Sequence, residues 1–333
     1  MRIRSRRKTR KRTRGNDPGR GAQQDMRLVF MGTPDIAAAA LEALIGAGHE
    51  IAGVFTREDK PVGRKQVLTP PPVKVLAQRH GIPVFQPKTL RDGEAERILR
   101  GLAPELIAVV AYGRILPKEI LALPRFGCVN LHVSLLPKYR GAAPIQWAVL
   151  NGETETGVTI IQMDEGMDTG DILAVAPVEI GPEETSADVF EKVTALGAET
   201  LARTVAAIGA GWVRAVPQEH EKATSAPPLK KEMAAFDFSQ DAKKLHDLIR
   251  GLYPWPVAQF TAGGVKVKVN RARAAAGVGA PGEVLSLKPL TVACGAGALE
   301  LLEVVPQGKR PMTGQEWAAG RRLKKGDLLR PEV

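Results

Sequence analysis

A regular alternation of short apolar segments with helical segments constrains the fold of residues 26–208 most strongly. The first unit consists of the apolar run Arg27–Met31, a turn at Gly32-Thr33-Pro34, the Ala-rich stretch Asp35–Ala47 and a second apolar run, Glu50–Thr56. A strand, a crossover helix and a second strand in this order form a parallel, right-handed unit. The chain therefore predicts an α/β domain built on a doubly wound, mostly parallel, Rossmann-like sheet.

The same alternation continues along the chain. Apolar runs predict further strands at Val84-Phe85, Glu105–Ala111, 127–132, Thr156–Met163 and Asp171–Ile180. Helical spacing of apolar residues predicts helices at Val73–His80, Arg91–Gly101, Ala143–Leu150 and Thr185–Ile208. Because the loops after parallel strands gather at one edge of an open sheet, we expect the functional site at the carboxyl ends of these strands.

The composition changes after Gly211 and predicts a second domain. A polar, proline-containing stretch is typical of a linker, and after one helical segment come short apolar runs at regular spacing, which predict a small β-barrel. The expected organisation is a tail at residues 1–25, a first domain at 26–213, a linker at 214–232 and a second domain at 233–333.

The net charge of +11 is concentrated at the N-terminus. Residues 1–25 hold ten Lys and Arg and two Asp, which leaves a net charge of +3 for the rest of the 333-residue chain. This tail has no apolar stripe and cannot bury a core, so we expect it to be disordered and dispensable.

Cysteine usage and hydropathy indicate a cytoplasmic protein. The two cysteines, Cys128 and Cys294, are far apart and fit no metal or redox spacing. No apolar run approaches the roughly 18 residues of a membrane span. We expect a reduced, cytoplasmic setting, a monomer, and no contact with membranes.

The stretch 127–147 contains the polar residues that most strongly suggest a reaction site. Asn130, His132 and Ser134 are two residues apart, so an extended backbone directs all three side chains to the same face. The loop SLLPKYRGAAP follows His132. A lone histidine is more often structural than catalytic, but an amide on the same face and a polar loop after it favour a site here.

The loop between the last two predicted strands adds carboxylates. Asp164, Glu165 and Asp168 lie within five residues, next to two glycines. An aspartate facing an imidazole can set the histidine tautomer, hold a water and move protons, although acidic residues are also common in turns. The spacing does not distinguish among the three carboxylates.

Residues 57–72 have no hydrophobic period and are predicted to form a loop. They include Arg57, Lys60, Arg64 and Lys65 among glycine and prolines. A loop of this length inside a compact domain is usually functional or disordered. Basic residues on it suit a phosphate backbone, and a solvated linker explains the composition equally well.

Two unrelated functions fit parts of the sequence. A nicotinamide-dependent oxidoreductase would need a GxGxxG fingerprint after the first strand, and that spacing is missing. A non-enzymatic RNA-binding protein would account for the basic tail, the 57–72 loop and the barrel. It would leave Asn130, His132 and the acidic loop unexplained.

Residues 127–147 and GVTIIQMDEGMDTGDIL at 157–173 resemble the two signatures of the folate-dependent formyltransferase family. The resemblance implies that Asn130, His132 and Asp168 form the catalytic trio, which selects one of the three carboxylates. It also implies 10-formyltetrahydrofolate as co-substrate and a reaction without a metal.

The resemblance places the folate beside two turns. One turn follows the strand at Glu105–Ala111, and the other follows His132, where two leucines could line the folate rings. The folate-binding residues that this implies are Tyr112, Gly113, Arg114, Leu116, Ser134, Leu135, Leu136 and Pro137.

Four further stretches resemble the branch of the family that formylates initiator tRNA: MGTPDIAAAALEAL, DKPVGRKQVLTPPPVKVLA, AYGRILP and GLYPWPVA. This implies formyl transfer to the α-amino group of methionine on initiator tRNA. It also implies an OB-like second domain that binds the acceptor arm, and tRNA contacts from Lys60, Arg64 and Lys65. A formyltransferase acting on a ribonucleotide or sugar amine would share the trio but lack this second domain and this 57–72 loop.

Overall fold

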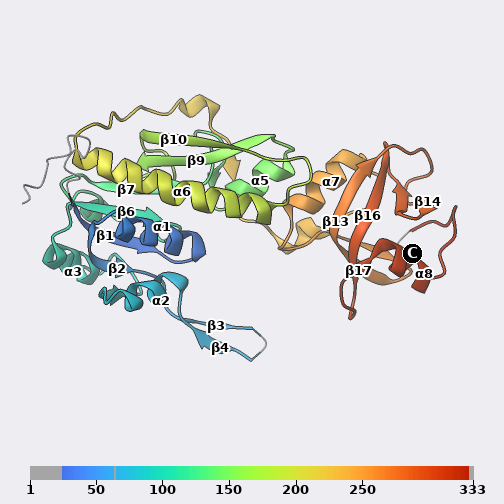
Figure 1. Ribbon diagram of the computed structural model, residues 1–333, viewed down its shortest axis with the longest axis horizontal. Coiled ribbons are helices and arrows are strands. Elements are labelled where there is room, and N and C mark those ends of the chain that lie inside the picture. The colour runs from blue at the N-terminus through green and yellow to red at the C-terminus, as the bar shows by residue number, and fades with distance from the viewer. Residues whose placement is uncertain (1–24, 64, 330–333) are drawn as a thin grey trace, which may run out of the picture.

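A computed structural model describes residues 25–63 and 65–329, which form two regions with separate hydrophobic cores (Figure 1). The predicted N-terminal tail, apart from Asp25, lies outside the described residues. The first region contains a seven-stranded sheet in the order β10 (Ile172–Glu179), β9 (Glu155–Gln162), β7 (Cys128–His132), β6 (Leu106–Val110), β1 (Arg27–Gly32), β2 (Glu50–Phe55), β5 (Val84–Phe85). Strands β7 to β5 are mutually parallel and β9 is antiparallel to both of its neighbours. The predicted doubly wound, mostly parallel sheet is confirmed.

Helices cover both faces of this sheet, which explains why its central strands are apolar throughout. On one face lie α1 (Asp35–Gly46), α2 (Pro72–Arg79), α5 (Pro144–Leu150) and α6 (Ser186–Gly209). On the other lie α3 (Glu94–Leu102) and α4 (Lys118–Leu121). None of the helices in the described part of the chain is long and apolar enough to cross a membrane.

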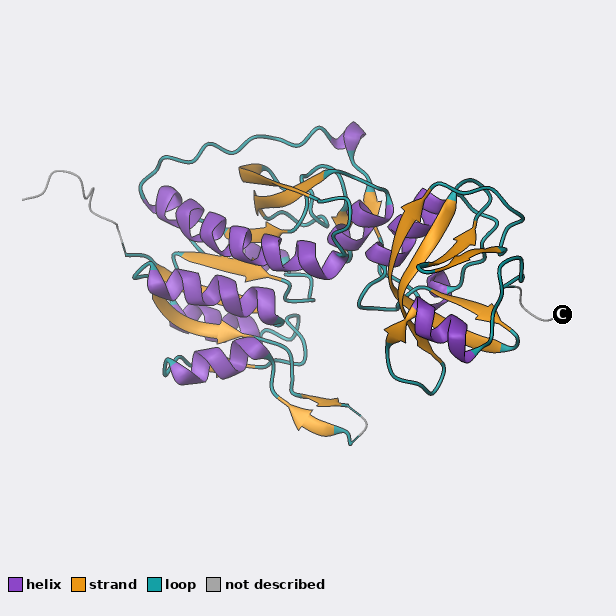
Figure 2. Cartoon of the chain, turned by 45° about the vertical axis from the view of Figure 1, so that its right-hand side comes forward, coloured by secondary structure: helices purple, strands orange, loops and turns teal. Residues whose placement is uncertain are grey.

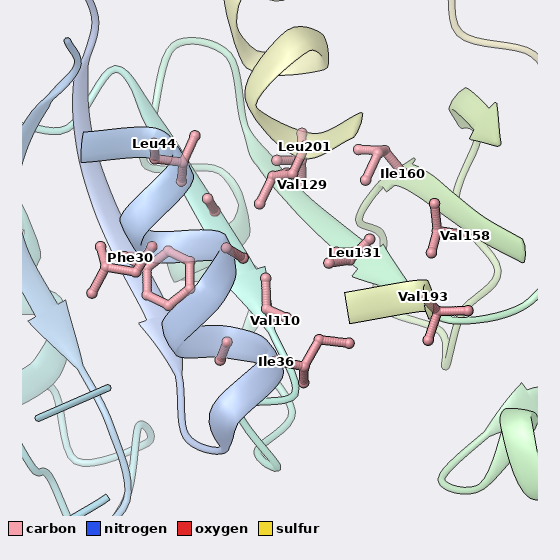
Figure 3. Close-up of a cluster of buried hydrophobic side chains, with 14 of the residues drawn as sticks. Phe30, Ile36, Leu44, Val110, Val129, Leu131, Val158, Ile160, Val193 and Leu201 are labelled. Atoms are coloured by element: carbon pink, nitrogen blue, oxygen red, sulfur yellow. The ribbon is translucent and has the colours of Figure 1, made fainter. Parts of the chain in front are cut away.

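The larger core lies between the sheet and the pair α1 and α6. Figure 3 shows Phe30 and Val110 from the central strands, with Leu201 of α6 over the neighbouring strands. Helix α6 begins with a capping box, in which the Thr185 hydroxyl accepts from the backbone of Asp188 and the Asp188 carboxylate accepts from Thr185. The cap fixes where α6 starts, and α6 in turn closes this face of the sheet.

The segment predicted as an irregular loop is instead a two-stranded hairpin that projects from the domain (Figure 2). Strand β3 (Lys60–Val62) pairs antiparallel with β4 (Val67–Thr69). Every residue of both strands is exposed. Because neither face of the hairpin packs on a core, no alternation of apolar and polar residues is needed, and the sequence pattern that reveals other strands is absent here.

The second region is an antiparallel β domain, as the regular spacing of apolar runs predicts. Its sheet has the order β12 (Gln259–Ala262), β13 (Val265–Ala275), β16 (Ala298–Pro306), β15 (Leu290–Ala293), β14 (Val284–Leu287), and β17 (Met312–Thr313) pairs with β16. Helices α7 (Ala242–Gly251) and α8 (Gly314–Gly320) belong to the same region. Register irregularities around Arg271 bend β13, which helps the sheet curl around its core.

Helix α7 also packs against α5 of the first region. The Ser186 hydroxyl donates to the Gly251 carbonyl at 2.8 Å, and Arg250 donates to the Glu184 carbonyl at 3.1 Å. Arg250 is buried and paired with Asp247, so its charge is compensated where the two regions meet.

The stretch predicted as a linker lies against the first region rather than free in solvent. It contains η1 (His220–Lys222) and β11 (Ser225–Ala226), and η2 (Lys231–Ala234) begins at its end. Strand β11 pairs with β8 (Arg140–Gly141) in the loop after His132. Polar, proline-containing composition predicts the lack of long regular elements here. It does not reveal backbone pairing with a distant loop.

Candidate active site

Two of the predicted catalytic side chains leave the same face of β7. Asn130 and His132 are two residues apart on this strand. The His132 side chain is only 6% exposed, and its Nε2 lies 2.9 Å from the carbonyl oxygen of Tyr139. Its Nδ1 lies 3.6 Å from Oδ1 of Asp168, whose side chain is 15% exposed. The structure thus brings together His132 at the end of β7 and Asp168 from the loop between β9 and β10.

The hydrogen bonds of His132 define which ring nitrogen can serve a substrate. A carbonyl oxygen can only accept, so Nε2 carries the hydrogen that it shares with Tyr139. The remaining nitrogen, Nδ1, faces the Asp168 carboxylate. Proton exchange with a reacting group therefore falls to Nδ1, the ring nitrogen beside that carboxylate.

The loop between β9 and β10 gives its three carboxylates different tasks. Asp164 accepts from the Gly166 backbone at 3.0 Å and from the Thr169 hydroxyl at 2.6 Å, so it organises the loop itself. Glu165 is exposed. Asp168 is the carboxylate that lies beside His132, and its other oxygen accepts from the Gly141 backbone at 2.9 Å.

Asn130 is half-buried beside the carboxyl end of β6. It pairs in register with Val109, two residues before the turn that starts at Ala111. Among the residues that the structure describes, its amide makes no hydrogen bond, in contrast to His132 and Asp168. Its N–H groups are available to a ligand.

The predicted folate-binding residues divide into buried supports and accessible contacts. Tyr112, Leu116, Ser134 and Leu136 are buried, whereas Arg114, Leu135 and Pro137 are half-buried and Gly113 is exposed. The Ser134 hydroxyl donates to the Lys138 carbonyl at 2.7 Å, so it stabilises the loop.

The turn after β6 is tied to the base of the hairpin. Arg57 donates to the Gly113 carbonyl at 2.8 Å, and Arg114 lies 3.8 Å from Glu58. Burial raises the pKa of the Tyr112 hydroxyl, and the nearby Arg114 and Arg57 offset part of this rise. Arg57 and Glu58, at the base of the hairpin, therefore stabilise this turn through a hydrogen bond and an ion pair.

The predicted tRNA contacts lie on the hairpin. Lys60 and Lys65 are exposed, and Arg64 lies outside the described residues. A second basic surface occurs in the C-terminal domain, where Lys266 and Lys268 line a cavity of about 340 Å³ together with residues 305–309. Both surfaces can accept phosphate groups.

The chain matches two family models that together cover most of its length. Residues 26–205 match the formyl transferase family, and residues 228–322 match the formyl transferase C-terminal domain. The chain belongs to the formyl transferase family. Its Asn130, His132 and Asp168 lie within the first match.

Relatives of this formyl transferase match along nearly their whole length. A protein named methionyl-tRNA formyltransferase from Myxococcus xanthus is 48% identical over 302 residues, which is 90% of this chain and 96% of that protein. A protein of the same name from Geobacter metallireducens is 43% identical over 304 residues, covering 91% of this chain and 98% of that protein.

Solved structures share the fold at low identity. An N-formyltransferase from Helicobacter canadensis, in complex with folinic acid and dTDP-3-aminofucose, has a TM-score of 0.64 at 17% identity and covers 86% of this chain and 100% of its own. HypX from Aquifex aeolicus in complex with tetrahydrofolic acid has a TM-score of 0.61 at 17% identity, and the match covers 93% of this chain and 51% of HypX.

Two exposed apolar side chains are sequence neighbours of candidate-site residues, and the sequence patterns do not predict a role for them. Ile115 follows Arg114, Met167 precedes Asp168, and each is 66% exposed. A large apolar residue inside an otherwise polar turn is the sequence feature that could have identified Ile115 and Met167. They are better placed than the buried Leu116 and Leu136 to contact an aromatic ligand.

Proposed function

We propose that this enzyme transfers the formyl group of 10-formyltetrahydrofolate to the α-amino group of methionyl initiator tRNA. The proposal rests on Asn130 and His132, which share one face of β7, and on the Asp168 carboxylate beside the His132 ring. The names of the relatives, which match over almost the full chain, support the acceptor.

Asn130 and His132 stabilise the negative charge that forms on the formyl oxygen. When the amine attacks the formyl carbon, that oxygen becomes an oxyanion. The free Asn130 amide donates one hydrogen bond, and His132 Nδ1–H in the protonated ring donates a charge-assisted one. Both donors lie on one strand, so little reorganisation is needed as the charge develops.

Asp168 stabilises the protonated ring and moves protons. A bond forms between the methionyl nitrogen and the formyl carbon, and the bond from that carbon to the folate nitrogen breaks. The attacking nitrogen loses a proton and the departing folate nitrogen gains one. A carboxylate that is 15% exposed can exchange protons with a water molecule between these two nitrogens.

The folate is held by the turn after β6 and the loop after β7. Gly113, Arg114, Leu135 and Pro137 offer accessible atoms. The buried Tyr112, Leu116, Ser134 and Leu136 fix the backbone of these loops. The described residues contain no group of three metal-ligating side chains, and the proposed reaction uses none.

The tRNA binds across the hairpin and the C-terminal domain. The exposed Lys60 and Lys65 meet phosphates near the acceptor end, with Arg64 between them in the chain. The cavity lined by Lys266 and Lys268 supplies a second phosphate contact. A monomer and a cytoplasmic location remain predictions.

Formyl transfer to charged initiator tRNA by the parent protein and by Asp168→Asn tests the proposal. Asparagine keeps an oxygen for the Gly141 N–H but removes the negative charge beside His132. We expect the parent to react and the variant to lose about 10²- to 10⁴-fold in rate. A parent that formylates a sugar or nucleotide amine but not charged tRNA would overturn the acceptor, and an active Asp168→Asn would overturn the trio.

A further inference from the structure

Gln218, in the segment that connects the two domains, is buried against the candidate site. It is 5% exposed. Its side-chain nitrogen donates to the carbonyl oxygens of Asp168 at 2.9 Å and Gly170 at 2.7 Å. Its side-chain oxygen accepts from Arg140 Nη2 at 2.6 Å and Nε at 3.2 Å. One amide therefore joins the loop that carries Asp168 to the loop that follows His132.

Backbone pairing on both sides determines the position of Gln218. Two residues earlier, Val216 exchanges both backbone hydrogen bonds with Ile172, at 2.8 and 2.9 Å. A few residues later, the Thr224 carbonyl accepts from the Arg140 backbone at 2.8 Å, and β11 begins. Gln218 is thus held between two anchors and spans the gap between the loops that they fix.

The backbone of Asp168 needs this support. Its φ is +55°, in the left-handed region that a residue with a side chain seldom adopts. A buried carbonyl without a partner is costly, and Gln218 donates to the buried carbonyl of Gly170 as well as to the part-buried carbonyl of Asp168. Through Arg140, the same side chain steadies the neighbour of Gly141, whose N–H holds the Asp168 carboxylate.

We infer that Gln218 is a positioning residue for formyl transfer, which acts by holding Asp168 in place beside His132. The inference rests on the proposed role of Asp168. It assigns to the interdomain segment a part in the chemistry beyond joining two domains. Because Gln218 acts on the reacting geometry and not on substrate contacts, its loss lowers kcat and leaves both KM values near those of the parent.

The test uses Gln218→Met and Gln218→Glu in the full chain. Methionine has nearly the shape of glutamine but no amide, so it removes all four hydrogen bonds. Glutamate keeps an acceptor for Arg140 but loses both donors to the loop of Asp168. The matched control is Glu219→Gln, at the adjacent exposed position, and the folded state of each variant is checked by its melting temperature.

We expect both Gln218 variants to lose about 10- to 100-fold in kcat with KM for folate and tRNA within about twofold of the parent. Glu219→Gln keeps the parent kcat. An unchanged kcat in a folded Gln218 variant, or a rise in KM alone, would overturn the inference. If Gln218→Met does not fold, Gln218→Glu decides.

Combining Gln218→Met with Asp168→Asn separates this inference from the proposed function. Single-turnover rates with enzyme in excess measure the residual activity of Asp168→Asn. If Gln218 acts through Asp168, adding Gln218→Met to Asp168→Asn costs no further rate. The same fold loss in both backgrounds would sink the positioning role and leave the trio intact. An Asp168→Asn variant as fast as the parent would instead refute the trio.

Discussion

The loop after β7 and the β3–β4 hairpin are both polar, glycine- and proline-containing segments, yet the structure treats them in opposite ways. The first is hydrogen-bonded to the interdomain segment: the backbone N–H groups of Arg140, Ala142 and Ala143 donate to carbonyl oxygens of Thr224 and Ala226. The second extends from the domain with every strand residue exposed (Figure 2).

This difference follows from the two tasks that we propose. Chemistry on a formyl group requires donors held within a fraction of an ångström, which a backbone ladder and buried side chains provide. Contact with a nucleic-acid backbone requires reach and positive charge, and tolerates motion. One molecule thus uses similar loop composition for a fixed site and for an extended arm.

Among the tests of this comparison, we expect the largest effect for His132→Ala. Loss of one oxyanion donor lowers kcat by about 10²- to 10³-fold. Binding of tRNA, measured by filter retention, stays at the parent level because the hairpin and the C-terminal cavity are untouched. His80→Ala, at an exposed position on the C-terminal cap of α2, is the control and keeps full activity. Joint loss of binding and catalysis in a folded His132→Ala protein would mean that the two regions are not separable.

Alanine at two glycines compares the regions directly. A β-carbon at Gly141, where φ is +124°, would lie 2.7 Å from the Ala226 carbonyl oxygen. At Gly63 in the hairpin, where φ is +72°, it would meet nothing within 4 Å. We expect Gly141→Ala to lower the free energy of unfolding, measured in urea, by about 1–3 kcal/mol. We also expect it to lower kcat by roughly tenfold. Gly63→Ala loses about 1 kcal/mol and keeps its kcat. Equal losses of kcat would remove the distinction.

The double variant Lys60→Ala, Lys65→Ala is expected to affect binding alone. Each lost phosphate contact weakens tRNA binding and makes the plot of log affinity against log salt shallower by about 1. The value of kcat at saturating tRNA stays unchanged. A lower kcat with an unchanged salt slope would place the hairpin in the chemistry and contradict its role as an arm.

The final prediction concerns the thiol reactivity of Cys128. Burial raises the pKa of Cys128, on β7, to about 12. At pH 8 in the native protein we expect iodoacetamide to modify Cys128 about 100-fold or more slowly than in the urea-unfolded chain, because so little thiolate is present. Lys65→Cys, on the exposed hairpin, supplies the fast-reacting control. Rapid labelling of Cys128 would show that the region around the site opens more easily than its packing indicates.

Much of the fold follows from local pattern. The run Glu105–Ala111 is mostly apolar because both faces of β6 are buried. Such a run is visible in the sequence without knowledge of the tertiary structure. The pairing of Asn130 with His132 is also local, since a strand directs residues two apart to one face. These features depend on neighbours along the chain.

Contacts between distant segments could not be obtained in this way. Only the family resemblance selects Asp168 over Asp164, and the contact of Asp168 with His132 appears only when the loop between β9 and β10 meets the end of β7. The sequence does not predict the hairpin strands, because exposed strands carry no apolar period.

By itself, then, the sequence determined the doubly wound sheet, the second β domain and the placement of Asn130 and His132 on one face of a strand, because burial and strand geometry produce periodic patterns in the chain. Only the tertiary structure decided that His132 Nδ1 faces the Asp168 carboxylate and that Gln218 donates to the backbone carbonyl of Asp168. A hydrogen bond between residues 50 positions apart produces no periodic pattern in either segment. It depends on how the folded chain brings the two segments together, and not on the residues adjacent to each in the sequence.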